Sequence, residues 1–246
     1  MENNKKKSLI PKAALIKAWL IWETFPQTCY NYERMMGQVV AHMFSAIIGF
    51  LYKDDPSKRK EVMKREIEFF NVHIEFGSCI LGMAVALEEQ KAMGENIPGE
   101  FITNLKTSLM GPLAGMGDTI WQGVVIPILL AVCIDLTRSG SGNVWGAVIY
   151  AVVIVVAAYA LSYWNFMFGY KAGSEAIMDF LEKGILNKLI KGASIMGCMV
   201  MGGLIVNYVK AVCGLKIVSS TTTYSIQTNF LDQVCPIYFY NSLSIL

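Results

Sequence analysis

Charge is scarce in this sequence, and its absence is concentrated in long runs. Of the 246 residues, 54% are hydrophobic and 16% are charged, whereas a soluble domain of this length carries about a quarter charged residues. Among the stretches without any Asp, Glu, Lys or Arg are residues 35–52, 76–87, 107–117, 119–134, 139–170 and 192–209. Because moving a charge into hydrocarbon costs about 2.5 kcal/mol or more, this pattern indicates side chains that face lipid.

Patterns typical of metal sites, disulfide frameworks and secretion signals are also missing. The six cysteines show no paired CxxC spacing, so we read them as small packing residues. The N-terminus has lysines before a mixed stretch but no clean apolar core, so it is not a signal peptide. We find no catalytic constellation, and a net charge of +2 identifies no partner. We therefore expect no metal, no cofactor, no nucleic acid and no catalytic residue in this chain.

The apolar runs predict membrane-spanning helices of different quality. A helix needs about 20 apolar residues to cross the hydrocarbon core, and residues 144–168 are long enough alone, with Trp145 and Trp164 near the ends, where headgroups favour aromatic rings. Residues 119–136 and 194–209 are shorter spans, while 77–87 is too short and suits a broken or re-entrant helix. The predicted fold class is an all-α polytopic membrane protein with broken or re-entrant helices.

The chain divides into an N-terminal lead-in, residues 1–34, and one membrane-embedded domain, residues 35–246. In the lead-in, Leu15, Ile16, Trp19 and Leu20 fall at helical spacing between lysines, which suits a helix in the membrane interface and equally an ordinary packing helix.

Two segments of the membrane-embedded domain look different from the apolar runs. Residues 53–68 hold six basic and five acidic side chains, and we interpret them as a helix with a solvated charged face. Residues 218–225 resemble a short strand or a loop.

The most unusual local sequence is Ser-Leu-Met-Gly-Pro-Leu-Ala-Gly-Met-Gly-Asp at residues 108–118. Gly111, Gly115 and Gly117, together with Pro112, are poor residues for an uninterrupted helix. A broken backbone at membrane depth is tolerated inside protein or beside a polar cavity, where it presents backbone groups to a ligand. We therefore expect these glycines to form the backbone of a substrate pathway.

Asp118 is the only charged residue between 107 and 134, and an ionisable group so placed is a functional-site hypothesis by default. Its carboxylate suits a sugar, because it accepts hydrogen bonds from neighbouring hydroxyls. Two alternatives remain: Asp118 caps a helix that begins at Thr119, and the Gly111–Gly115 spacing serves close helix packing.

A second polar cluster surrounds the run at 76–87. Glu88 and Glu89 end that apolar segment, either at the rim of a cavity or as a solvated helix end. His73 precedes it and is more simply a satisfied polar group than a ligand.

Six ordered motifs resemble the IID component of the mannose/fructose/sorbose-type phosphotransferase system. They are Asn-Tyr-Glu-Arg-Met at 31–35, Glu-Phe-Phe-Asn at 68–71, Ala-Leu-Glu-Glu-Gln at 86–90, Leu-Met-Gly-Pro-Leu-Ala-Gly-Met-Gly-Asp at 109–118, Lys-Gly-Ala-Ser-Ile-Met-Gly at 191–197 and Gln-Thr-x-x-Leu-Asp at 227–232. The resemblance covers about residues 13–235.

The resemblance implies a transport subunit in the bacterial cytoplasmic membrane. Such a subunit pairs with a IIC subunit, in an assembly of three IIC–IID pairs, to conduct a sugar such as mannose, fructose, sorbose or N-acetylgalactosamine. Separate IIA and IIB proteins carry the phosphohistidines, and some such complexes are docking sites for peptide bacteriocins. On this basis Asp118 is the first candidate for sugar binding, and Asn71, His73, Glu88 and Asn31 are further candidates. The alternatives are a non-conducting scaffold for IIC and a truncated, inactive paralogue.

The sequence departs from the family pattern at two places. Members commonly have Pro after the His of the Asn-x-His stretch, where this chain has Ile74. After the Leu-Asp motif the sequence reaches only Leu246, which predicts that the last apolar span of the family is missing or replaced.

Overall fold

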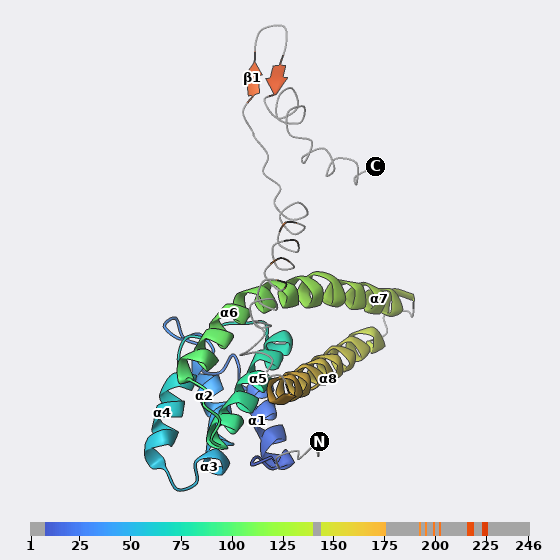
Figure 1. The fold of residues 1–246 in the computed structure, drawn as a ribbon. Coiled ribbons are helices and arrows are strands. Elements are labelled where there is room, and N and C mark those ends of the chain that lie inside the picture. The colour runs from blue at the N-terminus through green and yellow to red at the C-terminus, as the bar shows by residue number, and fades with distance from the viewer. Residues whose placement is uncertain are drawn as a thin grey trace. The chain divides into compact units, whose positions relative to one another are not determined.

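A computed structural model of the chain describes residues 8–139 and 144–175, the positions 192, 195, 199 and 202, and the short segments 216–218 and 223–225. The chain divides into two compact units, Met1–Gly197 and Cys198–Leu246. The part of the first unit that the structure describes is helical (Figure 1). The membrane span expected at 194–209 lies outside the described residues.

The N-terminal helix α1 (Lys12–Thr24) packs against the core with one face. Trp22 is fully buried, and its indole Nε1 donates to the Ser78 hydroxyl at 3.0 Å. Trp19 donates in the same way to Ser162 at 2.9 Å, and the two serine hydroxyls lie 2.7 Å apart. These bonds satisfy indole groups that would otherwise be buried unpaired, so the packing-helix interpretation of the lead-in fits the structure.

Three short helices follow. They are α2 (Gly37–Ser45), α3 (Ile48–Leu51) and α4 (Pro56–Glu66). Helix α4 begins as its sequence predicts, because the Asp55 side chain accepts a hydrogen bond from the Lys58 amide at 3.0 Å and Pro56 occupies the first turn, where its missing N–H costs nothing.

The centre of the first unit is the pair formed by α5 (Ile74–Ala92) and α8 (Trp145–Glu175). These helices approach closely because glycines face the partner's backbone. A Cβ on Gly82 would lie 2.1 Å from the Phe166 carbonyl oxygen, and one on Gly169 would lie 2.0 Å from that of Cys79. Glycine at such positions lets the two helix axes come close together.

Helices α6 (Gly99–Gly117), η1 (Asp118–Val125) and α7 (Ile126–Ser139) run on without an intervening loop. The glycine-rich motif was expected to break the helix. That expectation is wrong in form: α6 continues through Pro112 to Gly117, and the irregularity is the following eight residues, which are wound as a π-helix. Pro112 removes one backbone hydrogen-bond donor inside α6. The π-helical turns that follow are wider than α-helical turns, and they keep the backbone helical from α6 into α7 without a loop.

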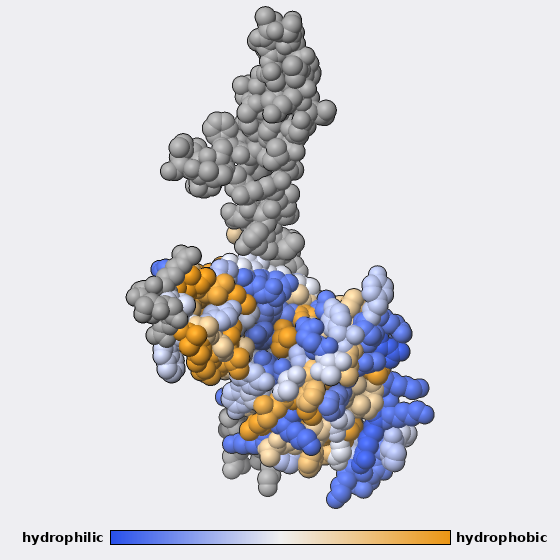
Figure 2. All heavy atoms as spheres, turned by 180° about the vertical axis from the view of Figure 1, so that it is seen from behind, coloured by the Kyte–Doolittle hydropathy of each residue, from blue (hydrophilic) through white to orange (hydrophobic). Residues whose placement is uncertain are grey.

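Two helical stretches are long and apolar enough to cross a membrane, judged by length and composition. They are Gly99–Thr137, with 39 residues, and Trp145–Gly173, with 29. The second agrees with the span predicted at 144–168. Figure 2, seen from behind, shows hydrophobic side chains gathered over the α7 and α8 end on the left and hydrophilic ones over the α4 side on the lower right.

In the second unit the structure describes a short antiparallel hairpin of β1 (Lys216–Val218) and β2 (Thr223–Ser225). Lys216 pairs with Ser225 and Val218 with Thr223. The strand alternative for 218–225 therefore holds for part of that segment, as a small addition to a helical fold. The expected absence of a last span concerns residues outside the described ones.

Candidate functional site

A cavity of about 760 Å³ opens between the start of α5, the α6–η1 junction and the loops that precede α2 and α5. Its lining combines polar and apolar side chains. The residues that line it are Gln27, Tyr30, Met36, Asn71, Val72, His73, Ile74, Glu75, Ala114, Asp118, Trp121, Gln122 and Ile126. Carboxylates, amides and the aromatic rings of Tyr30 and Trp121 in a single concave site suit a small polyhydroxylated ligand, because polar groups fix orientation while apolar surface contributes contact area.

Asp118 reaches the cavity from the first turn of η1 and is exposed. One of its carboxylate oxygens, Oδ1, accepts a hydrogen bond of 3.4 Å from Gln122, one turn further along. The helix-cap alternative is wrong, since Asp118 has helical backbone angles (φ −59°, ψ −39°) within a continuous helix. Among the described residues, the hydrogen bond from Gln122 is the one this carboxylate accepts, so most of its acceptor capacity is open to a ligand.

His73 and Glu75 form the floor of the cavity at the entry to α5. The His73 Nδ1 atom lies 2.9 Å from Glu75 Oε2, and both side chains are nearly buried. The two atoms are close enough for an ion pair when His73 is protonated, although Nδ1 makes no hydrogen bond in this orientation among the described residues. Gly117 packs against the same ring, because a Cβ there would lie 2.4 Å from both Cβ and Cγ of His73.

A third titratable group, Glu23 of α1, lies close enough to His73 and Glu75 to interact with both electrostatically. Its buried Oε2 atom has no hydrogen-bond partner. The pKa of Glu23 is raised to about 7, chiefly by burial and in part by the nearby Glu75 carboxylate, while a hydrogen bond with Ser162 lowers it. A carboxyl with this pKa exchanges its proton near neutral pH.

Asn71 contributes an amide at the edge of the cavity, and its Oδ1 accepts a hydrogen bond of 3.3 Å from the Tyr30 hydroxyl. Asn31 was grouped with it as a candidate, but it is not among the lining residues. Its Oδ1 instead accepts from the backbone amides of Glu33 and Arg34, at 3.1 and 2.9 Å. The structure thus assigns Asn31 to a turn.

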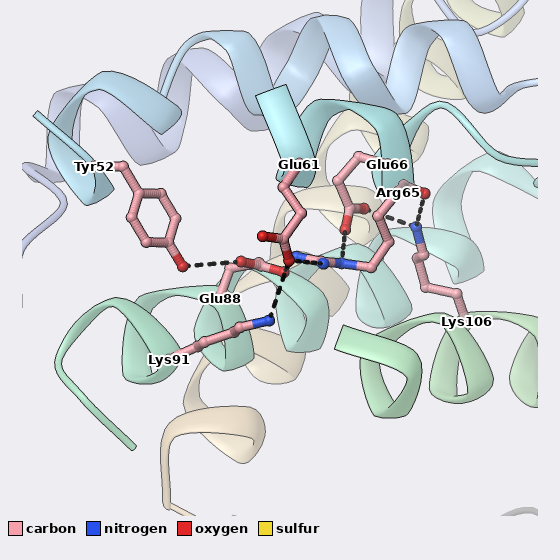
Figure 3. A network of polar contacts seen from close by, with 7 residues as sticks. All are labelled: Tyr52, Glu61, Arg65, Glu66, Glu88, Lys91 and Lys106. Atoms are coloured by element: carbon pink, nitrogen blue, oxygen red, sulfur yellow. Dashed lines mark hydrogen bonds and ion pairs between the residues drawn. The ribbon is translucent and has the colours of Figure 1, made fainter. Parts of the chain in front are cut away.

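Glu88 was also a candidate, and the structure places it elsewhere. Its side chain is fully buried, forms an ion pair with Arg65 and accepts a hydrogen bond from the Tyr52 hydroxyl at 3.4 Å. Figure 3 shows these groups within one network between α4, α5 and α6. The Glu88 carboxylate keeps the pKa of Arg65 raised although burial works against it.

The solvated charged face expected for α4 is present, with Lys58, Lys60, Glu61 and Lys64 exposed, but the same network buries two charged residues at the end of the helix. Glu66 is fully buried and lies 2.7 Å from Lys106 Nζ, while Arg65 is 8% exposed. Glu61 joins them from the surface, 3.5 Å from Arg65 and 3.9 Å from Lys91. Buried charges are tolerated here because each acid faces a base.

Glu89 shows why a solvated end of α5 was also the wrong expectation. It is 4% exposed, and its Oε1 accepts hydrogen bonds from the backbone amides of Leu9 and Ile10, at 2.7 and 3.0 Å. The Tyr170 hydroxyl donates to its other oxygen. Glu89 thus fastens the start of the described chain to the central helix pair.

The three glycines expected to form a pathway backbone have different surroundings. Gly117 contacts His73, as described above, whereas a Cβ added to Gly111 or Gly115 would meet no atom within 4 Å among the described residues. Neither of these two glycines lines the cavity. Because a Cβ at either position would meet no described atom, the close helix packing considered for the Gly111–Gly115 pair is also not seen within the described part of this chain.

The cavity therefore brings together Asp118, Asn71 and His73 from the predicted set. Five further polar or aromatic residues line it that were not predicted, namely Glu75, Trp121, Gln122, Gln27 and Tyr30. Helical spacing was the available signal for two of them, since 121 and 122 follow Asp118 by three and four residues. Within the described residues, no group of three or more His, Cys, Asp or Glu side chains is arranged to hold a metal ion.

Comparison with known proteins identifies related sequences over most of the chain. The family described as "PTS system mannose/fructose/sorbose family IID component" matches residues 9–241. The mannose-specific EIID component of Escherichia coli K12 is 38% identical over 181 residues, which are 73% of this chain and 62% of that protein. The chain thus spans less than two thirds of that relative's length.

Two further comparisons extend the match. The fructose permease IID component of Bacillus subtilis is 31% identical over 237 residues, 94% of this chain and 84% of that protein. Among solved structures, one described as the mannose transporter ManYZ in complex with microcin E492 has a TM-score of 0.77 and 31% sequence identity, covering 97% of this chain and 88% of that one.

Proposed function

This chain belongs to the mannose/fructose/sorbose family of IID components of the sugar phosphotransferase system, and from that membership we propose that it lines the path of a sugar across the bacterial cytoplasmic membrane. The observation that carries the proposal is the cavity, where Asn71 and His73, from the loop before α5, meet Asp118 at the start of η1. A carboxylate accepts hydrogen bonds from sugar hydroxyls, and an amide both donates and accepts them. The Trp121 ring offers an apolar face to sugar C–H groups.

The proposed partner is a IIC subunit. The similar ManYZ structure contains a mannose transporter, and the exposed apolar side chains of α7 and α8 suit a surface covered by lipid or by a partner in the membrane. These include Ile128 at 61% exposure and Val156 at 62%. A trimer of IIC–IID pairs is the proposed assembly, and the chain crosses the membrane more than once.

The proposed role in phosphorylation is indirect. The resemblance to the family implies that separate IIA and IIB proteins carry the phosphohistidines, so we assign phosphoryl transfer to those partners. The chain then conducts mannose, fructose, sorbose, N-acetylgalactosamine or a similar sugar to the cytoplasmic side, where IIB delivers phosphate.

Replacing Asp118 by Asn tests this function. The change keeps the shape and removes the negative charge, and the loss of charge-assisted hydrogen bonds of about 1.5–3 kcal/mol lowers sugar affinity roughly 10- to 150-fold. The measurement is uptake of the four radiolabelled sugars by cells that express the variant with its IIC, IIA and IIB partners.

Asp135→Asn is the matched control. Asp135 belongs to α7 on the same continuous helical stretch and does not line the cavity, so its variant should take up sugar like the parent. Co-purification of the IIC subunit shows whether the complex is intact. Unchanged uptake by Asp118→Asn in an intact complex would refute a conducting role and support a scaffold for IIC.

A further inference from the structure

Three ionisable side chains meet where α1 touches the start of α5. The Trp22 indole of α1 donates a hydrogen bond of 3.1 Å to the carbonyl oxygen of Ile74. The residue after Trp22 is Glu23, which interacts with the two neighbours of Ile74, His73 and Glu75. His73 and Glu75 line the cavity, whereas Glu23 does not. The three side chains, called the acid–histidine cluster below, therefore connect the cavity wall to a carboxyl outside it.

Two polar atoms of the acid–histidine cluster are buried without a hydrogen-bond partner among the described residues. They are Oε2 of Glu23 and Nδ1 of His73. Burying a polar group without a partner is unfavourable, and burying an unpaired charge is more so. A bound proton reduces this cost, because it neutralises Glu23 or, on His73, places a positive charge 2.9 Å from Glu75 Oε2. The two atoms thus indicate a place where the fold can hold a proton.

The charged groups that act on Glu23 belong to the same cluster. Burial and the Glu75 carboxylate raise the pKa of Glu23, to about 7, while Ser162 and His73 lower it. The other titratable side chains of helices packed on α1 contact different parts of the chain. They are Tyr159 and Tyr163 of α8, against Trp19, His42 of α2, against Phe25, and Glu89 of α5, which accepts from the amides of Leu9 and Ile10. On α1 itself, Lys12 and Lys17 are exposed.

We propose that Glu23, His73 and Glu75 form a proton-binding site in the wall of the cavity, and that a sugar binds there together with a proton. This site rests on the proposed function, since it adds a second ligand to the same cavity. A sugar in the cavity displaces water from the side formed by His73 and Glu75, which makes negative charge in the cluster harder to solvate. A proton from the solvent that adds to the Glu23 carboxylate removes one of the two negative charges, so the protonated form binds sugar more tightly.

The sign of the pH dependence follows from linkage. If sugar binding takes up a proton, sugar affinity is highest where Glu23 is already protonated and falls as pH rises through its pKa of about 7. We expect the affinity to fall about three- to tenfold between pH 6 and pH 9, which corresponds to about 0.3–0.5 proton taken up per sugar at the midpoint. At pH 5 the sugar-free protein already carries the proton, so uptake there should be close to zero.

The test is calorimetric titration of the complex of this chain with its IIC subunit in nanodiscs, with the best-bound sugar of the uptake panel. Titrations at pH 7.5 are repeated in buffers of different ionisation enthalpy, because the apparent binding enthalpy changes with the buffer in proportion to the protons taken up. Dissociation constants are also measured at pH 6 and pH 9. Since the sugar has no group that titrates in this range, the protons must be bound by protein.

Glu23→Gln is the diagnostic variant, because it keeps the shape of the side chain and stays neutral at every pH. It should take up no proton, and it should bind sugar at pH 9 as tightly as at pH 6. His42→Gln is the matched control, since it removes the other of the two histidines, and His42 does not line the cavity. This control should match the parent in proton uptake and in pH dependence.

Three results would overturn the proton site, and they differ in what they imply. Sugar binding by the parent without proton uptake removes the site and leaves the proposed function intact; this result does not depend on any variant folding. Proton uptake that persists in Glu23→Gln assigns the proton to another group of the complex. If an intact complex binds no sugar of the panel, the cavity is not a sugar site, and the proposed function falls as well.

Discussion

The buried ion pair between Lys106 and Glu66 offers a direct test of how the first unit is held together. The Lys106 Nζ atom lies 2.7 Å from Glu66 Oε2, and the side chains are 5% and 0% exposed. The pair joins α6 to the end of α4, two helices that are about 40 residues apart in sequence (Figure 3). Replacing Lys106 by Met keeps most of the side-chain volume and removes the positive charge.

The expected cost follows from what remains. Glu66 keeps one neighbouring base, Arg65, whose Nε is 3.6 Å away and which already pairs with Glu88. The other Glu66 oxygen, Oε1, has no hydrogen-bond partner even before the change. Removing one member of a buried pair typically costs about 3–5 kcal/mol, which for a chain of this size corresponds to about 6–20 °C in Tm.

The assay is thermal unfolding of the detergent-solubilised protein followed by circular dichroism. The matched control is Lys58→Met, because Lys58 pairs with Asp55 at 3.8 Å with both side chains well exposed; such surface pairs contribute little, and Tm should change by less than about 2 °C. The double variant Lys106→Met with Glu66→Gln should recover most of the loss, since no buried charge is left alone. A Tm for Lys106→Met equal to that of the control would refute the reasoning.

Two other changes probe the cavity floor. Gly117→Ala should displace His73, since the added Cβ would lie 2.4 Å from its Cβ and Cγ atoms. We expect the free energy of unfolding to fall by about 1–3 kcal/mol and sugar uptake to be reduced. The control is Gly115→Ala, where the added Cβ would meet no described atom within 4 Å, and it should leave stability and uptake unchanged. The pKa of Glu23 is raised from 4.5 to about 7, so its carboxyl stabilises the fold only while it is protonated and loses that contribution as pH rises. Glutamine stays neutral at every pH. Relative to the parent, Glu23→Gln should therefore be more stable by roughly 1–2 kcal/mol more at pH 8 than at pH 5. Thermal melts at the two pH values check this, and an equal shift at both would contradict it.

The apolar runs predicted the helices better than they predicted what surrounds them. Residues 144–168 were expected to span, and they form most of α8. The expected break at 111–117 instead appears as a π-helical stretch just after it. Glycine and proline propensities indicate a weak point in a helix. The sequence does not show whether the helix breaks into a loop there or continues with π-helical turns.

Charged residues were predicted less well, because the sequence shows neighbours along the chain and not partners across it. Glu66 and Arg65 were expected on a solvated helix face, yet both are buried because Lys106 and Glu88 meet them from other helices. Local charge density therefore gave no sign of which acids would be paired inside.

The structure separates the acidic residues of this chain by what neutralises them. Glu66 and Glu88 each face a base, and Glu89 faces backbone amides, so their electron pairs are already used in holding helices together. The Asp118 carboxylate accepts one long hydrogen bond, 3.4 Å, from the Gln122 amide and lies on an open cavity. An acid whose partner is a single neutral amide keeps most of its acceptor capacity for a ligand, which is why Asp118, rather than the better-buried Glu88, is the residue on which the binding of a neutral sugar should depend.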